Sequence, residues 1–168
     1  IGNESLRETF DIKEDPRVSA SLEDLKEQFN LLLQIRDKLT ETHLAVERIR
    51  NLRQQIMAWN KVLASRDIYQ ALISTGRSID MKLVRVEDNL VQTRALTQVD
   101  RLKYQIQLNG KLGGLLNWIA NSDDKPTKQS YEVFNELSER LDVEMKVLRK
   151  IIDSDVQGFN RLIQEMQV

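Results

Sequence analysis

The chain has 168 residues, with 25 Lys or Arg against 26 Asp or Glu and a formal net charge of -1. This length suits one domain with a core of its own. The sequence contains no Cys, which excludes disulfides, thiolate metal sites and Cys nucleophiles. The balanced charge gives no overall attraction to nucleic acid, and no apolar run approaches the ~20 residues that span a bilayer. We therefore expect neither a nucleic-acid partner nor membrane insertion.

Residues 1–18 differ from the rest of the chain, and we expect an extended segment there. Leu6, Phe10 and Ile12 share one parity, an alternation typical of a short strand. A lone strand lacks backbone partners. The segment is therefore either a loosely docked or disordered tail, or the last strand of a preceding β domain. The chain does not begin with Met, so we expect it to be part of a longer or processed protein.

From residue 19 to 168 the spacing of apolar residues predicts helices. The first begins at Ser21, where Ser21 and Asp24 form a capping-box pattern. We expect a turn between Asn60 and Arg66, although one unbroken helix remains an alternative. Apolar residues at steps of three and four predict the buried stripe of this helix: Leu22, Leu25, Phe29, Leu32, Ile35, Leu39, Val46, Ile49, Ile56 and Leu63.

Further helix boundaries follow from caps and breakers. A second helix is expected over 67–92, with Gly76 inside it against a close neighbour or at a bend. A third begins near a second capping-box pattern at Thr97 and ends at 121–126. A fourth begins after Thr127, and 153–155 marks a kink or a restart before a last short helix. The predicted fold class is all-α: an antiparallel up-down bundle of about four long helices plus a short C-terminal helix.

Candidate chemical groups are few. His43, the only histidine, lies in the apolar stripe of the first helix and is expected at its boundary, without identifiable metal ligands beside it. Asp123 and Asp124 are adjacent in a polar loop and are expected to form a solvated turn rather than a catalytic pair. A group of glutamates at steps of four and three is expected to form a wet helix surface: Glu132, Glu136 and Glu139.

Two other residue types invite a functional interpretation. Arginines concentrate in the first helix, but without aromatic stacking partners they do not indicate nucleic-acid binding. For Trp59 and Trp118 we favour packing over a role as interface anchors. The arginines in question are Arg36, Arg48, Arg50 and Arg53. From the residues alone, no catalytic, cofactor-binding or metal-binding residue is predicted, and no cofactor is expected.

Two tracts carry a resemblance to a known family. They read DRLKYQIQLNGKLGGLLNWIANSDDKPTKQSYEVFNELSERLD over 100–142 and DSDVQGFNRLI over 153–163. They resemble the C-terminal helical region of large bacterial proteins with BNR-type or sortilin-like Vps10 propeller repeats, which often carry a glycosyl hydrolase label. The tract DPRVSASLEDLKEQF over 15–29 is similar to the join between their β region and their helices. The chain departs from the family at Gln105, often a proline, and at Gly110, Gly113 and Gly114, where the family favours Asn or Ala.

This resemblance implies that a propeller lies upstream of Ile1 and that the parent protein is exported. No catalytic residue of the family maps onto this chain. Our first hypothesis is a non-catalytic helical module that packs against the upstream β domain, a second copy or another protein. The alternatives are a glycan-processing enzyme fragment that uses Asp123, Asp124 and their neighbours, or a homo-oligomerising coiled coil.

Overall fold

The computed structural model describes residues 7–11, 13, 15–64, 67–95, 97 and 99–166, without the side chains of Asp67 and Arg101. Every regular element in this part of the chain is helical, which confirms the all-α bundle. The α-helices are α1 (Leu22–Leu63), α2 (Gln70–Leu90), α3 (Leu108–Ala120), α4 (Lys128–Lys150) and α5 (Gln157–Glu165). Short 3-10 turns occupy η1 (Asp67–Tyr69) and η2 (Val99–Leu102), and η3 (Ile151–Val156) is a π-helical segment.

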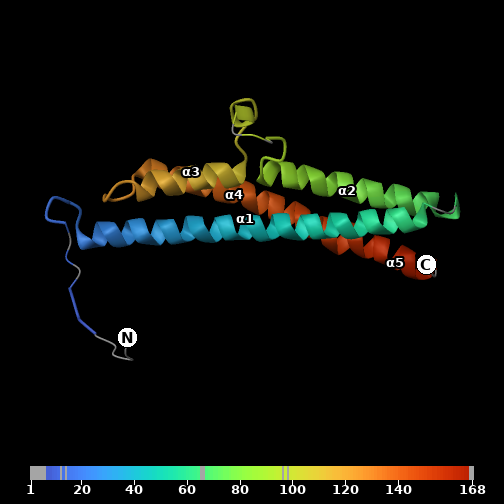
Figure 1. Ribbon diagram of the computed structural model, residues 1–168, viewed down its shortest axis with the longest axis horizontal. Coiled ribbons are helices and arrows are strands. Elements are labelled where there is room, and N and C mark those ends of the chain that lie inside the picture. The colour runs from blue at the N-terminus through green and yellow to red at the C-terminus, as the bar shows by residue number, and fades with distance from the viewer. Residues whose placement is uncertain are drawn as a thin grey trace, which may run out of the picture.

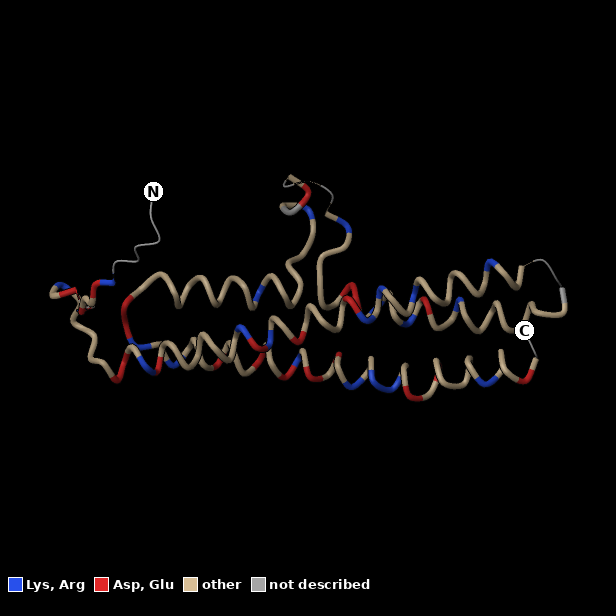
Figure 2. The backbone as a smooth tube through the Cα atoms, turned by 60° about the horizontal axis from the view of Figure 1, so that its bottom comes forward, with Lys and Arg blue, Asp and Glu red and all other residues tan. Residues whose placement is uncertain are grey.

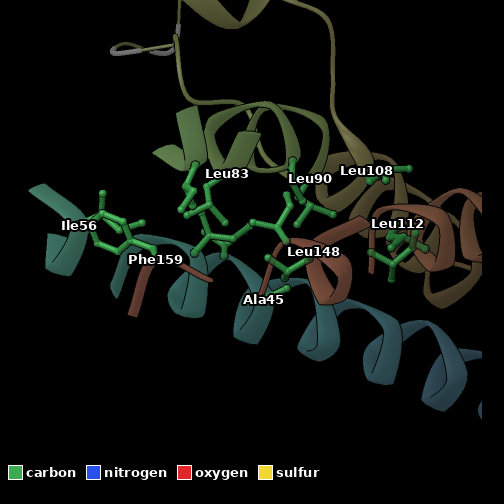
Figure 3. Packing of buried hydrophobic residues seen from close by; sticks show 14 of the residues in the cluster. Ala45, Ile56, Leu83, Leu90, Leu108, Leu112, Leu148 and Phe159 are labelled. Atoms are coloured by element: carbon green, nitrogen blue, oxygen red, sulfur yellow. The ribbon is translucent and has the colours of Figure 1, made fainter. Parts of the chain in front are cut away.

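These helices form three rods, of which the second runs antiparallel to the first and the third (Figure 1). Helix α1 runs the full length of the bundle and packs against α2, α3 and α4. Helices α2 and α3 return one after the other and form the second rod. Helix α4 continues through η3 into α5 and forms the third. Figure 3 shows Leu83 and Leu90 of α2 facing Ala45 of α1 and Leu148 of α4 in the shared core.

Half of the predicted stripe of α1 is buried, namely Ile35, Val46, Ile49, Ile56 and Leu63, and all of these except Val46 fall on a seven-residue repeat. Leu22 and Phe29 were expected in the core, but both are exposed. The repeat corresponds to 3.5 residues per turn, which keeps one seam facing the neighbouring helices over a long distance. A pattern scored on apolarity misses it because two of its members are polar. The buried line is Gln28, Ile35, Thr42, Ile49, Ile56 and Leu63.

Both polar members of this line have hydrogen-bond partners. The Gln28 amide donates to the carbonyl of Ile119 at 2.8 Å, at the end of α3, and to the carbonyl of Ser122 in the following turn. The Thr42 hydroxyl donates to the Lys38 carbonyl at 2.8 Å within its own helix. Burial of polar groups costs little when they are bonded in this way. Gln28 therefore ties the end of α3 to α1.

The ends of α1 agree with the sequence. The Ser21 hydroxyl accepts from the backbone N–H of Asp24 at 3.2 Å, and Asp24 accepts from the backbone N–H of Ser21 at 3.0 Å, so the predicted capping box is confirmed. The helix ends at Leu63, so the predicted turn is confirmed and the unbroken helix is wrong. Residues 65 and 66 of the predicted turn lie outside the described residues.

The third helix was predicted to begin near Thr97, but the helix itself begins later, at Leu108. Thr97 and Asp100 do form a capping box, with the Thr97 hydroxyl donating to Asp100 at 2.9 Å. It starts only the 3-10 turn η2, and regular helix resumes at Leu108. Leu102, at the end of this turn, is 89% exposed, on a segment that projects from the bundle between α2 and α3 (Figure 1). A cap satisfies the first turn of a helix, but only packing stabilises the turns that follow.

The other predicted boundaries hold. Thr127 caps α4, accepting from the backbone N–H of Ser130 at 3.2 Å. The kink expected at 153–155 is the π-helical segment η3. Of the predicted N-terminal strand, Leu6 and Ile12 lie outside the described residues. Residues 7–11 form no regular element and are exposed.

Candidate functional site

Asp123 and Asp124 lie in the exposed turn between α3 and α4, as expected. Neither is among the residues that line the five best-formed grooves of the described surface. Their neighbour Lys125 forms ion pairs across the bundle, with Glu27 at 2.9 Å and Asp24 at 4.0 Å. The charges of this turn therefore hold it against the start of α1.

The glutamate face of α4 is a solvated surface, as predicted. Glu132 pairs with Lys128 at 3.3 Å and Glu136 with Arg140 at 3.7 Å, both one helical turn apart. Glu139 is exposed as well. Exposed pairs of this spacing contribute little to stability.

His43 does not lie at the boundary of the core. It is exposed, and the buried position belongs to Thr42, one residue earlier, because the seven-residue line passes through 42. Among the described residues, no group of three or more His, Asp or Glu is placed to hold a metal ion.

Two of the α1 arginines belong to a charged cluster between α1 and α2. Arg50 donates to Glu87 at 2.6 Å, while Arg53 donates to Glu87 at 2.8 Å and to Asp80 at 2.8 Å. Glu87 is only 4% exposed. Partial burial acts to lower the pKa of Arg53, but its hydrogen bonds with Asp80 and Glu87 outweigh burial and raise that pKa.

Asp80 and Glu87 were not predicted as partners of these arginines, because nothing in a helix of mixed charge marks which acids face a neighbour. The concentration of arginines on α1 was recognised from the sequence, but their acidic partners on α2 were not. A buried ionic cluster of this kind is best attested as a device that fixes register between helices. We infer that the cluster sets the register of α1 against α2. Elsewhere, acidic and basic residues are interspersed along α1, α2 and α4, whereas α3 carries a single charged residue, Lys111 (Figure 2).

The most distinctive surface feature is a groove of about 430 Å³ between α3 and α4, which we call the Trp118 groove. Residues three and four apart on each helix form its two walls, so each helix contributes one continuous face. It is lined by Lys111, Gly114, Leu115 and Trp118 from α3 and by Val133, Glu136, Leu137 and Arg140 from α4.

Trp118 contradicts the packing expected for both tryptophans. Trp59 is partly buried and packs against the core, whereas Trp118 is 75% exposed. Across the groove Val133 is 43% exposed. An added Cβ at Gly113 or Gly114 would meet no described atom within 4 Å, so this part of α3 borders open space. Large apolar side chains gathered on an accessible surface are typical of interaction sites.

The two ends of the groove differ in chemistry. Helices α3 and α4 run antiparallel, so Lys111 and Arg140 lie at one end and Trp118 and Val133 at the other. Lys111 has no carboxylate within ion-pairing distance among the described residues, and it is partly buried. The groove is therefore apolar at one end and basic at the other.

Comparisons with protein-family models, with curated proteins and with solved structures find no match to this chain. None of the helices in the described parts combines the length and the apolarity that crossing a bilayer requires. The surface of the bundle is therefore the basis for a proposal about function.

Proposed function

We propose that this chain is a non-catalytic helical module that binds protein through the Trp118 groove. The observation that carries the proposal is the 75% exposure of Trp118 on a regular helix of a well-packed bundle. Tryptophan is among the residues that most often dominate binding energy at protein interfaces. A rigid helix presents it without the entropy cost of ordering a loop.

The same proposal includes the setting that the resemblance implies. The module ends a large exported protein with propeller repeats, and the upstream β domain is one of its candidate partners. The tract over 15–29 and the two tracts over 100–142 and 153–163 support this setting. Determining the natural sequence upstream of Ile1 tests this setting directly. We expect β-repeat patterns there, and their absence would contradict the setting.

The enzyme alternative has weaker support. Glycosidic hydrolysis uses two carboxyl groups that face each other across the bond that is cleaved, ~5–9.5 Å apart. Asp123 and Asp124 are neighbours on one exposed turn. The clustered acids that are buried, such as Glu87, are already bound by arginines. We therefore propose no reaction for this chain.

Photo-crosslinking tests the binding surface. The photoreactive residue p-benzoylphenylalanine is placed at Val133, inside the groove, in the protein as its own cells produce it. A matched control carries the same residue at Gln54, which is exposed on α1 and lines none of the larger grooves. We expect a discrete protein adduct from position 133 and none from position 54. Equal crosslinking at both positions would remove the proposal.

A further inference from the structure

The Trp118 groove has the geometry into which further helices pack. Its walls consist of residues at i, i+3, i+4 and i+7 on α3 and on α4, the spacing that forms ridges and grooves between packed helices. Helix α1 packs against both of these helices. The exposure of Trp118 and Val133 shows that the groove opens away from α1. A pair of helices laid across it would complete a four-helix arrangement.

The chain itself carries a pair of helices of this shape. Two copies that meet through the same groove form an isologous contact, in which each contributes the same surface. If the two-fold axis ran along the helices, Lys111 of each copy would meet the partner's Arg140, and the like charges would repel. An axis across the helices reverses the partner and brings its apolar end to the basic end. Charge therefore selects the antiparallel arrangement.

The reversed arrangement matches the groove residue by residue. Lys111 comes to lie over the partner's Trp118, where an ammonium group is attracted to the face of the indole. Arg140 comes to lie at the partner's Val133, which Glu132 and Glu136 flank along α4. Both acids are exposed and carry only the loose surface pairs already described.

The middle of the groove is compatible with close approach. Gly114 lies between Lys111 and Trp118 and has no side chain to hold the two α3 backbones apart. Glu136 lies near the same level and would approach its own equivalent. It is neutralised there by its own Arg140, at 3.7 Å, and by the partner's Arg140. The central acids thus lie between arginines of both copies.

We propose that the occupant of the Trp118 groove is a second copy of this chain, packed antiparallel so that Lys111 and Arg140 meet the partner's Trp118 and Glu132. This inference rests on the proposed function of the groove as a protein-binding surface. It commits that function to self-association.

Sedimentation equilibrium of the full chain tests the proposal, over a range of about 1 µM to about 1 mM. We expect a reversible monomer–dimer equilibrium that weakens as salt is added. Trp118→Ala should raise the dimer dissociation constant at least about tenfold. Met81→Ala removes another exposed apolar side chain, on α2, and should leave the constant unchanged. Circular dichroism should show every variant folded, because these side chains are exposed.

A charge reversal tests the antiparallel orientation. Arg140→Glu should weaken the dimer, and adding Glu132→Arg should recover part of the loss, because the contact between positions 140 and 132 re-forms with its charges exchanged while Glu136 still lacks its arginines. A chain that stays monomeric, a dimer indifferent to Trp118→Ala, or a double variant without recovery would each overturn this inference. The proposed function fails separately. If position 133 crosslinks to a different protein while the chain is monomeric, the groove binds protein but not a second copy.

Discussion

Gly76 illustrates how one residue sets the distance between two helices. It is buried in α2, and a Cβ at this position would lie 2.6 Å from the side-chain oxygen of Asn60 on α1. That oxygen is itself buried and has no hydrogen-bond partner among the described residues. The glycine therefore leaves room for the Asn60 side chain, whose oxygen has no hydrogen-bond partner among the described residues.

We predict that Gly76→Ala destabilises the chain by about 1 kcal/mol, because overpacking outweighs the gain in helix propensity. Adding Asn60→Ala removes the clash and the unpaired oxygen, so the double variant should be more stable than Gly76→Ala alone. Urea unfolding followed by circular dichroism measures both. Gly113→Ala is the control, since its Cβ meets open space, and it should stabilise by up to ~1 kcal/mol. Equal stabilisation by both alanines would contradict the close contact.

Glu87 is the second residue on which the α1–α2 seam depends. Glu87→Gln leaves Arg50 and Arg53 without their shared carboxylate, and we expect a loss of about 2 kcal/mol, reduced from a fully buried pair because Arg50 remains largely exposed. Asp37→Asn breaks only an exposed pair with Arg36 and should change stability by less than about 0.5 kcal/mol. The same unfolding assay compares them. Equal effects would mean that burial of Glu87 contributes nothing.

Residue exposure was only partly predictable from the sequence. The close neighbour of Gly76 was foreseen, because a glycine inside a helix calls for a packing reason. The exposure of Trp118 was not, since it depends on which face of α3 the rest of the chain covers. The burial of Gln28 and Thr42 was hidden by their polarity, and only their hydrogen bonds explain it.

At the scale of elements, caps determine where helices begin. Thr127 is the N-cap of α4, and its hydroxyl accepts a hydrogen bond from the backbone N–H of Ser130. Thr127→Ala should destabilise the chain by about 1 kcal/mol, the usual cost of losing an N-cap. Thr127→Ser keeps the hydroxyl and should recover most of that loss. Thermal unfolding by circular dichroism distinguishes the two. If serine is no better than alanine, the hydroxyl is not the stabilising group.

The capping box of α1 predicts a dependence on pH. Hydrogen bonds from the Ser21 hydroxyl and then its backbone N–H lower the pKa of Asp24 from its ordinary 3.8. A carboxyl whose pKa falls on folding stabilises the fold above its unfolded pKa, and that contribution is lost as pH falls through the folded pKa. Asp24→Asn should therefore be less stable than the parent at about pH 6, and the gap should narrow as the pH falls below 3.8. A gap that is the same at both pH values would contradict this.

Caps also show where prediction from the sequence stops. The same pairing of hydroxyl and carboxylate occurs at Ser21 and at Thr97, yet one begins a helix of 42 residues and the other a turn of four. The difference lies beyond the cap: α1 is buried along its whole seam, whereas Leu102 after the second cap is exposed and gains nothing from continuing the helix. Local signals locate helix starts, and long-range packing decides helix lengths.

At the scale of the whole molecule, three rods share one core. The charged cluster links α1 to α2 in one half of the bundle, and contacts of Gln28 and Lys125 link α1 to the end of α3 and the turn after it in the other half. The all-α class and most boundaries followed from spacing and caps. The division into a second and a third helix was predicted too, but their end-to-end arrangement in one rod was not, because short connections between helices favour antiparallel neighbours. The Trp118 groove is a product of this arrangement, and the order of residues along the chain does not reveal it.

The central claim is that protein covers Trp118 where this chain works. Hydroxyl-radical footprinting with mass spectrometry tests it, by comparing the dilute isolated chain with the protein in the cells that produce it. Met57 and Met81, exposed on α1 and α2 outside the groove, are internal references. The account predicts that oxidation of Trp118 falls severalfold in cells relative to these methionines. Equal oxidation of Trp118 in both settings would contradict it.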